Sequence, residues 1–413
     1  MHVLIAASGS YGDIYPFVGL GRLLRLRGHE VDVCTNEHFQ VQVKAEGLGF
    51  VSAGSAEYYD QTIRHPNIWH PKRGIELVLR SVAKFLPLGY DVLRRHYREG
   101  ETLLVASTLA LAARLLRETH GGRLVTVHLA PNVFRSGEDA IRLPNGSMAA
   151  AAPKWLKRLL WKFIDRAAID RLVGPGLNRY RAELGLAPVK YIFRDWIHSP
   201  DRVIGMFPEW FASPRADWPA QTRLSGFPLY DAAEHEPLPD SLESFLAAGD
   251  APVMFAPGTA NTAARKFFET SLAACRRSGR RALFVSRYGR QVPGKLPDWA
   301  RHFNYLPFSK ILPRCSAFVS HGGVGSVSQG FRAGVPQLVR PMGFDQFDNG
   351  RRAENLGVAC SLPTTAYQAD AVVAAFEQLA EPECAQACID VARQFADGNG
   401  LQLAADLVEQ TGI

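Results

Sequence analysis

The sequence has few cysteines and no long apolar run, and each shortage excludes a class of protein. Six cysteines are scattered over 413 residues without a Cys-x-x-Cys pair. This pattern argues against a disulfide scaffold or a zinc finger and fits a reducing compartment. The longest apolar stretch, residues 103–116, contains Ser107, Thr108 and Arg114 and is too short to cross a bilayer. We therefore expect a cytoplasmic protein without transmembrane helices.

Acidic residues are outnumbered, which gives a formal net charge of +7 and a pI near 9.1. Such a balance suits an anionic small ligand, an anionic membrane surface or nucleic acid. The basic residues are scattered and form no known nucleic-acid-binding signature, so we expect no nucleic-acid partner. A hydrophobic content of 47% in a chain of this length predicts a globular protein with more than one domain.

Alternating strands and helices predict two parallel α/β domains. Apolar strands are expected at 3–7 and 31–35, with a helix between them that starts at Pro16. Further strands are expected at the following ranges: 103–106, 124–127, 203–207, 253–256, 282–286, 303–306, 317–320 and 337–340. A passage rich in proline separates the two series. We predict an N-terminal Rossmann-like domain at 1–215, a linker at 216–240, a C-terminal Rossmann-like domain at 241–395 and a final helix at 396–413 that packs back on the first domain. The two domains are expected to face a central cleft.

The run His321-Gly322-Gly323-Val324-Gly325-Ser326 follows a predicted buried strand and opens a predicted helix. Its glycines let the backbone approach a ligand closely, and the free amides of a helix N-terminus bind phosphate. His321 can add a hydrogen bond or a charge. A satisfied buried histidine is the alternative, and the flanking glycines make that interpretation weaker.

A second polar run, Asp345-Gln346-Phe347-Asp348-Asn349, follows the next predicted strand. Carboxylates and amides suit sugar hydroxyls, which both donate and accept hydrogen bonds. A phosphate-binding turn followed by a reader of hydroxyls indicates a nucleotide sugar. Taken alone, Asp345 and Gln346 could equally cap a turn.

Several stretches of this sequence resemble a known family. Residues 305–313, 321–323 and 345–349 resemble the donor-binding signature of GT-B glycosyltransferases that are similar to plant and macrolide glucosyltransferases, and residues 9–16 resemble their opening loop. The segments at 196–200, 207–212, 217–219 and 226–229 resemble the bacterial rhamnosyltransferases of rhamnolipid synthesis. The resemblance covers nearly the whole sequence and implies a GT-B fold.

The resemblance also implies roles for individual residues. Asp13 would be the catalytic base, preceded by Gly12, and His321 would contact the donor diphosphate. The other residues that the resemblance places at the donor are Gly12, Thr259, Tyr305, Leu306, Gly323, Gly325, Ser326, Gln329, Asp345 and Gln346. Tyr305 would stack on the nucleobase, and Gln329 stands where many relatives bind ribose with a glutamate. Asp13 could instead be a helix cap, and Tyr305 a core residue.

The sequence contains no Asp-x-Asp pair, with which metal-dependent transferases hold a divalent ion. We therefore expect no metal or cofactor, and an inverting transfer from a dTDP- or UDP-sugar in which His321 and the helix N-terminus neutralise the leaving group. The main hypothesis is transfer of rhamnose or glucose to a hydrophobic, lipid-like acceptor such as a hydroxyalkanoyloxyalkanoate. The alternatives are a polyketide or other small aglycone, a non-catalytic auxiliary subunit, and a nucleotide-sugar epimerase.

The segment around Trp155 and Trp161 mixes tryptophans with Lys157, Arg158 and Lys162. One interpretation is a partly buried helix with a solvated basic face. The other is an element that contacts the acceptor lipid or the inner membrane from the cytoplasmic side.

Overall fold

The computed structural model describes residues 1–139, 142–143, 146–147, 152–231, 237–395, 398 and 400–412. The protein divides into two compact units. Unit 1 comprises Met1–Pro228 with Asn399–Ile413, and unit 2 comprises Leu229–Gly398. Residues 232–236 of the predicted linker, and residues 396, 397, 399 and 413 of the predicted C-terminal segment, lie outside the described residues.

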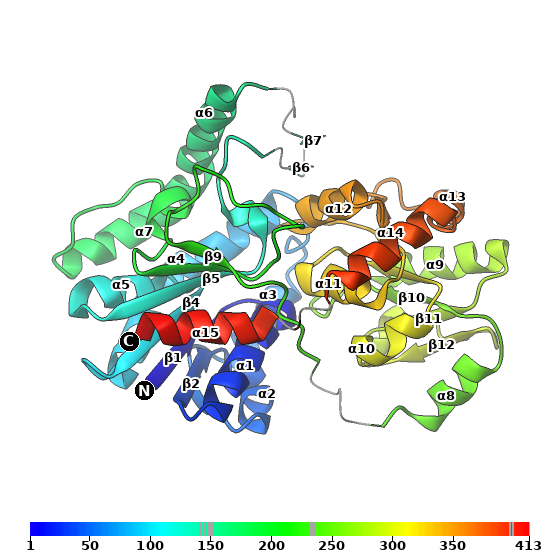
Figure 1. The fold of residues 1–413 in the computed structure, drawn as a ribbon, viewed down its shortest axis with the longest axis horizontal. Coiled ribbons are helices and arrows are strands. Elements are labelled where there is room, and N and C mark those ends of the chain that lie inside the picture. Colours follow the sequence, from blue (N-terminus) through cyan, green and yellow to red (C-terminus); the bar gives the residue numbers. More distant parts are fainter. Residues whose placement is uncertain are drawn as a thin grey trace. The chain divides into compact units, whose positions relative to one another are not determined.

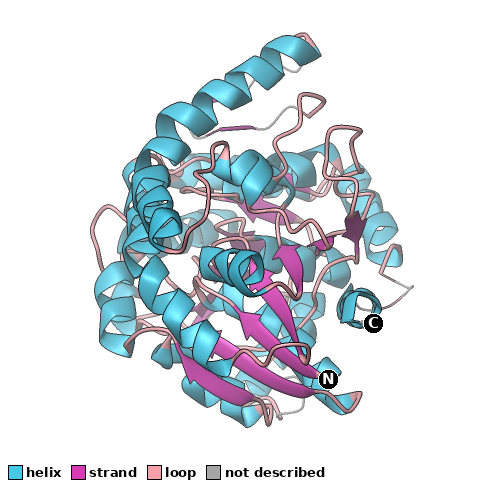
Figure 2. Cartoon of the chain, turned by 90° about the vertical axis from the view of Figure 1, so that its left-hand side faces the viewer, coloured by secondary structure: helices cyan, strands magenta, loops and turns pink. Residues whose placement is uncertain are grey.

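Unit 1 is built on a seven-stranded parallel sheet with the order β3-β2-β1-β4-β5-β8-β9 (Figures 1 and 2). Its strands are β1 (His2–Ala6), β2 (Glu30–Thr35), β3 (Gly49–Ser52), β4 (Thr102–Ser107), β5 (Arg123–His128), β8 (Arg202–Gly205) and β9 (Thr222–Leu224). The central strands are buried on both faces, as their apolar runs predict for a parallel sheet. A separate antiparallel pair joins β6 (Arg142–Leu143) to β7 (Gly146–Ser147).

The helices of unit 1 connect these strands. They are α1 (Tyr11–Leu26), α2 (Gln40–Ala45), α3 (Ala56–Ile63), α4 (Arg73–His96), α5 (Leu111–His120), α6 (Lys154–Ile164), α7 (Asp170–Glu183) and α15 (Gly400–Gly412). Helix α15 returns from the end of the sequence to pack beside α1, where Arg27 donates hydrogen bonds to Asp406 at 2.6 Å and to Glu409 at 2.7 Å. The last helix is therefore part of unit 1 (Figure 1).

Unit 2 repeats the architecture with a six-stranded parallel sheet in the order β12-β11-β10-β13-β14-β15. Its strands are β10 (Val253–Ala256), β11 (Ala282–Val285), β12 (Ala300–Phe303), β13 (Ala317–Ser320), β14 (Gln337–Val339) and β15 (Ala359–Ser361). Its helices are α8 (Asp240–Ala247), α9 (Arg265–Ser278), α10 (Phe308–Ile311), α11 (Val324–Ala333), α12 (Gln346–Asn355), α13 (Ala369–Leu379) and α14 (Pro382–Arg393).

Three local predictions differ from the structure. The first helix begins at Tyr11 and contains Pro16, so Asp13 lies in its first turn. The strand expected at 303–306 lies at Ala300–Phe303, because the residues before Pro307 turn out of the sheet. Thr222–Leu224 form β9 against β8, so residues as far as Pro228 belong to unit 1 although we expected a linker from 216.

Candidate active site

The candidate donor site of unit 2 lies at the carboxyl ends of three neighbouring strands. Strand β13 is central, with β10 on one side and β14 on the other, and all three run parallel. The loops that follow them carry Gly258 and Thr259, His321 to Gly323, and Arg340 to Asp345. Open parallel sheets bind ligands at this edge, because the loops after adjacent strands meet there.

His321 directly follows β13, and its ring lies against two glycines. A Cβ atom at Gly258 would stand 3.0 Å from the imidazole Nε2, and one at Gly323 would stand 2.7 Å from it. Gly258 also has a φ of +100°, so no other residue fits there without strain. Burial lowers the pKa of His321 to about 4, and its Nδ1 is buried without a hydrogen-bond partner among the described residues. His321 is therefore neutral at pH 7. From the sequence, His321 could contribute either a hydrogen bond or a positive charge to a phosphate, and the neutral ring leaves only the N–H hydrogen bond.

Helix α11 begins immediately after this loop. Its N-cap, Gly323, has no side chain with which to satisfy the first amides of the helix. Ser326 and Val327 already donate their backbone N–H groups to the Gly323 carbonyl, at 2.9 and 3.1 Å. Gly325 is exposed and Ser326 is half-buried at this turn. The amides before them, with the positive end of the helix dipole, form a site suited to an anion.

Asn349 on α12 connects the two polar runs predicted from the sequence. Its Nδ2 donates to the Gly322 carbonyl at 3.0 Å and to Oδ2 of Asp345 at 2.7 Å. Asp345 is thereby held beside the glycine turn that carries His321. The Oδ1 of Asn349 is buried and unpartnered among the described residues. The sequence indicated Asn349 as a reader of hydroxyls, whereas the structure also gives it a positioning role.

The side chain of Gln346 is largely committed to its own loop. Its Oε1 accepts hydrogen bonds from the backbone N–H groups of Met342 at 2.8 Å and Gly343 at 3.2 Å. Only the Nε2 group remains to donate to a hydroxyl. Phe344, in the same loop, adopts a φ of +57°, which is rare for a bulky side chain and marks a constrained turn.

The remaining residues that were predicted to bind the donor differ in their exposure and contacts. Thr259 is exposed in its loop. The hydroxyl of Tyr305 donates to Asp231 at 2.7 Å, which fixes its ring. Leu306 is 1% exposed and packs in the core with Leu312 and Phe318, so its side chain cannot face a ligand and only its backbone could. Gln329 on α11 is 8% exposed, and its Oε1 has no partner among the described residues, which suits a hydroxyl donor such as ribose.

Arg340 is a candidate that the sequence analysis missed. It follows β14 directly, and its guanidinium carbon lies 5.5 Å from the ring centre of Phe267 and 5.3 Å from that of Tyr367. Within the described parts of the protein it forms no ion pair, and its Nε is buried without a partner. A cation that stacks on two rings without an acidic partner suits an anionic ligand. A lone arginine at the end of an apolar strand was the available signal.

Asp13 lies in the first turn of α1, in unit 1. Its Oδ2 accepts hydrogen bonds from the backbone N–H of Ser10 at 2.7 Å and from the Ser10 hydroxyl at 2.9 Å. A Cβ atom at Gly9, whose φ is +137°, would lie 2.4 Å from the same oxygen, so the carboxylate needs a glycine there. The other oxygen, Oδ1, makes no hydrogen bond with any described residue. The capping and catalytic interpretations therefore use different oxygens of one carboxylate.

The environment of Asp13 also affects its proton affinity. The residue is exposed, as is its neighbour Gly12, yet the surrounding protein displaces enough bulk water to raise the pKa of the carboxyl. The two hydrogen bonds from Ser10 oppose this effect and lower the pKa. A raised pKa makes a carboxylate a stronger base, which suits proton abstraction.

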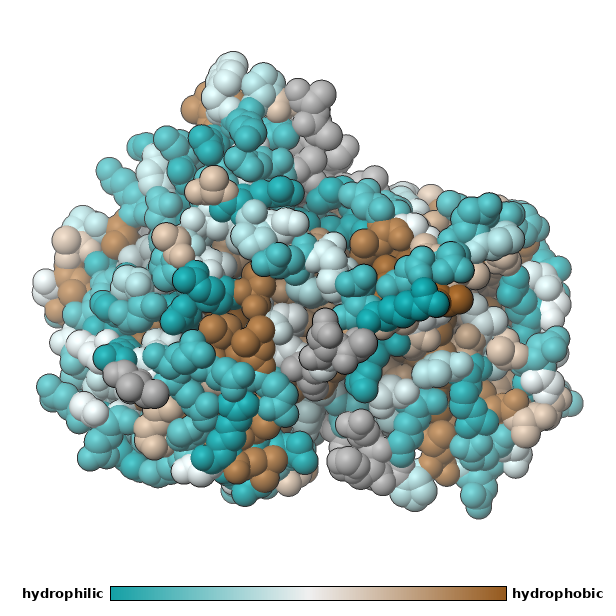
Figure 3. Space-filling view, in the orientation of Figure 1, coloured by the Kyte–Doolittle hydropathy of each residue, from teal (hydrophilic) through white to brown (hydrophobic). Residues whose placement is uncertain are grey.

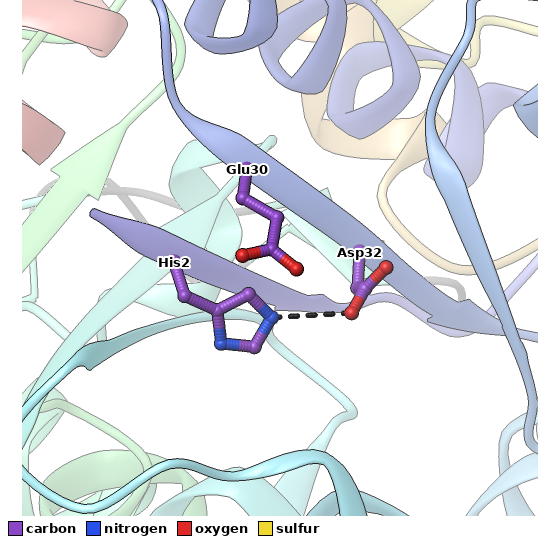
Figure 4. A group of neighbouring side chains, drawn as sticks. All are labelled: His2, Glu30 and Asp32. Carbon is purple, nitrogen blue, oxygen red and sulfur yellow. Dashed lines mark hydrogen bonds and ion pairs between the residues drawn. The ribbon is translucent and has the colours of Figure 1, made fainter.

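A cluster of His2, Glu30 and Asp32 stands at the opposite edge of the unit 1 sheet, where β1 and β2 begin (Figure 4). His2 is bonded through Nδ1 to Thr102 at 2.8 Å and through Nε2 to Asp32 at 3.1 Å. Glu30 receives both of its hydrogen bonds from Arg98, at 2.6 Å each. These hydrogen bonds and ion pairs indicate that the cluster is structural and links the beginnings of neighbouring strands.

Two family models match parts of this sequence. Residues 3–92 match the model of the glycosyltransferase family 28 N-terminal domain, and residues 284–403 match that of the erythromycin biosynthesis protein CIII-like C-terminal domain. The protein is 28% identical over 424 residues to O-mycaminosyltylonolide 6-deoxyallosyltransferase of Streptomyces fradiae, covering 99% of this sequence and 97% of the relative.

Solved structures match over the full length. The glycotransferase of kitacinnamycin superimposes with a TM-score of 0.75 at 20% identity, covering 100% of this protein and 99% of the other. Spinosyn rhamnosyltransferase SpnG, complexed with thymidine diphosphate, superimposes with a TM-score of 0.68 at 20% identity, covering 98% of this protein and 100% of the other. Two parallel α/β units with this topology define the GT-B fold. The protein is a GT-B glycosyltransferase that depends on a nucleotide sugar.

Proposed function

We propose that this enzyme transfers a deoxyhexose from a thymidine diphosphate sugar to a hydroxyl of a polyketide or similar small hydrophobic aglycone. The names of the relatives support this acceptor class, which the sequence analysis held as its alternative, over a hydroxyalkanoyloxyalkanoate. The observation that carries the proposal is the site in which Asn349 holds Asp345 beside the turn of His321. The hydrogen-bond donors proposed for the phosphates and the side chains proposed for the sugar hydroxyls therefore lie in one cluster of loops.

We further propose that Asp13 is the base, acting through Oδ1. The acceptor hydroxyl loses its proton to this oxygen as its own oxygen bonds to the anomeric carbon. The bond from that carbon to the diphosphate breaks, and the electron pair leaves with the diphosphate. Such a single displacement inverts the anomeric centre. Capping by Oδ2 holds the carboxylate in place without using the reacting oxygen.

The diphosphate leaves toward donors that unit 2 supplies. In this proposal, the His321 N–H and the first amides of α11 bind its oxygens, and Arg340 adds the positive charge that the neutral imidazole lacks. Gln329 binds the ribose, while Asp345 and the Nε2 group of Gln346 bind the sugar hydroxyls. Tyr305 stacks on the nucleobase of the donor. Preorganised donors of this kind stabilise charge that develops in the transition state.

An acceptor panel tests the proposed function. Purified enzyme is incubated with thymidine diphosphate deoxyhexoses and either macrolactone aglycones or hydroxyalkanoyloxyalkanoates, and glycosides are detected by mass spectrometry. Glycosylated macrolactone is the expected product. Product from the lipid alone would restore the lipid-acceptor hypothesis. Conversion of the donor without acceptor would indicate an epimerase, and no turnover without an added partner protein would indicate an auxiliary subunit.

A further inference from the structure

Helix α6 exposes a row of large apolar side chains. Trp155, Leu159 and Phe163 are 67%, 56% and 70% exposed. Their spacing of four residues places them in one line along the helix. Exposed apolar side chains normally occur singly, so a row of three on an 11-residue helix marks an interaction surface.

A row of cations runs beside the apolar row. Arg158 and Lys162 on α6, and Arg166 in the π-helical turn Asp165–Ile169 that follows it, each stand three residues after a member of that row, and all are exposed. Arg158 forms an ion pair with Asp217 at 3.2 Å, whereas Lys162 and Arg166 form none within the described residues. The sequence of α6 contains four basic and no acidic residues. The outward side of the helix is therefore both apolar and positive.

The opposite side of α6 attaches the helix to unit 1. Trp161 is 1% exposed, its Nε1 donates to the Ser136 carbonyl at 3.1 Å, and the Arg135 guanidinium lies 4.4 Å from its ring centre. The exposed row is thus not the core face of the helix. Figure 1 shows α6 extending away from the sheet of unit 1, and Figure 3 shows hydrophilic and hydrophobic side chains next to one another over it.

We propose that α6 is an interfacial helix that binds the surface of an anionic lipid bilayer. Helix α6 carries Trp and Phe on one side, has cations next to them and contains no acidic residue. This composition is typical of helices that lie in the headgroup region of a bilayer. The positive charge is complementary to anionic headgroups, which Lys162 and Arg166 could bind because neither forms an ion pair within the described residues. Among the described residues, none of the helices has the length and hydropathy of a membrane-spanning segment. This inference goes beyond the proposed reaction and does not depend on it.

Vesicle flotation of the intact protein tests the proposal. Vesicles of phosphatidylcholine with one quarter phosphatidylglycerol are compared with phosphatidylcholine alone. We expect binding to the mixed vesicles, weakened by salt, and at least tenfold weaker binding for the double variant Trp155→Glu/Phe163→Glu. The double variant Lys162→Gln/Arg166→Gln should lose the preference for phosphatidylglycerol. Val41→Glu on α2, at a position 75% exposed, is the matched control and should bind as the wild type does.

Thermal unfolding and light scattering complete the experiment. If the glutamate variant unfolds early, Trp155→Ser/Phe163→Ser replaces it with the same expected loss. Unchanged vesicle binding by a folded variant would overturn the proposal, as would failure of the wild-type protein to bind the mixed vesicles. A wild-type dimer that these substitutions convert to monomer, without vesicle binding, would show that a second copy covers α6 and would also overturn it.

Discussion

Replacing Asp13 by Asn separates the capping role of this side chain from its proposed catalytic role. An amide oxygen can still accept the hydrogen bonds that Ser10 donates to Oδ2, so helix α1 keeps its cap. The amide cannot take a proton from the acceptor. A general base contributes about 10²- to 10⁴-fold to the rate, which corresponds to about 3 to 5 kcal/mol of the barrier. We expect kcat to fall by that factor with little change in the melting temperature.

Asp13→Ala gives the contrasting result. It removes base and cap together, so the same loss of kcat should come with about 1 kcal/mol of lost stability. Both variants are assayed for turnover at saturating donor and for unfolding in urea. If Asp13→Asn retains wild-type turnover while Asp13→Ala loses only stability, the carboxylate is a cap and our assignment of the base is refuted.

The pH dependence gives a second measurement on the same residue. The protein around the exposed Asp13 displaces part of its bulk water and raises the pKa of the carboxyl, and the hydrogen bonds from Ser10 oppose that rise. Since the base must be ionised, kcat/KM should increase as the pH rises through the pKa of Asp13, above the usual range for aspartate. Ser10→Ala removes the bond at 2.9 Å and should move this limb to higher pH. The limb should be absent in Asp13→Asn, and its persistence there would mean that another group titrates.

Three further substitutions address unit 2. His321→Ala should lower kcat by about 10²- to 10³-fold, because one hydrogen-bond donor to the leaving diphosphate is lost. Steady-state kinetics that show an unchanged kcat and only a raised acceptor KM would contradict this. Asn349→Ala releases both Asp345 and the Gly322 carbonyl, so calorimetry should show weaker binding of thymidine diphosphate sugars. Unchanged affinity would show that this tie does not position the site. Leu306→Ala should destabilise the protein by about 2 to 5 kcal/mol in urea unfolding while the folded fraction keeps its donor KM, and a raised donor KM would restore Leu306 to the site.

Much of the fold follows from the sequence because buried parallel strands are continuous apolar runs. Val3 to Ala6 and Ala317 to Ser320 are fully apolar or nearly so, and both are strands as predicted. The short edge strand β9 could not be recognised, because Thr222–Leu224 contains two polar residues and follows a proline-rich passage. The start of α1 was also misplaced, since Pro16 is a strong signal for a first turn but is tolerated one turn further in.

The candidate site was predicted less evenly. Glycines and a histidine between a strand and a helix indicate a phosphate-binding turn, because few other patterns leave amides free there. The sequence could not predict that Gln346 bonds the backbone of its own loop or that the side chain of Leu306 is buried, because both depend on which residues the folded protein brings near. Arg340 escaped notice for the same reason. Its meaning comes from Phe267 and Tyr367, residues far from it in sequence, and from the lack of an acidic partner among the described residues.

In the proposed mechanism, the neutral state of His321 determines which other group must stabilise the leaving diphosphate. Burial that holds its pKa near 4 means that a cation at this position would cost free energy until an anion arrives. A diphosphate at the turn would favour the protonated form, so the imidazole can respond to the charge that develops as the bond to the sugar breaks. In this proposal the permanent charge comes from Arg340, which follows the strand next to β13 and forms no ion pair among the described residues. If this division is correct, Arg340→Gln should weaken binding of thymidine diphosphate in calorimetry, while His321→Ala should affect turnover more than binding.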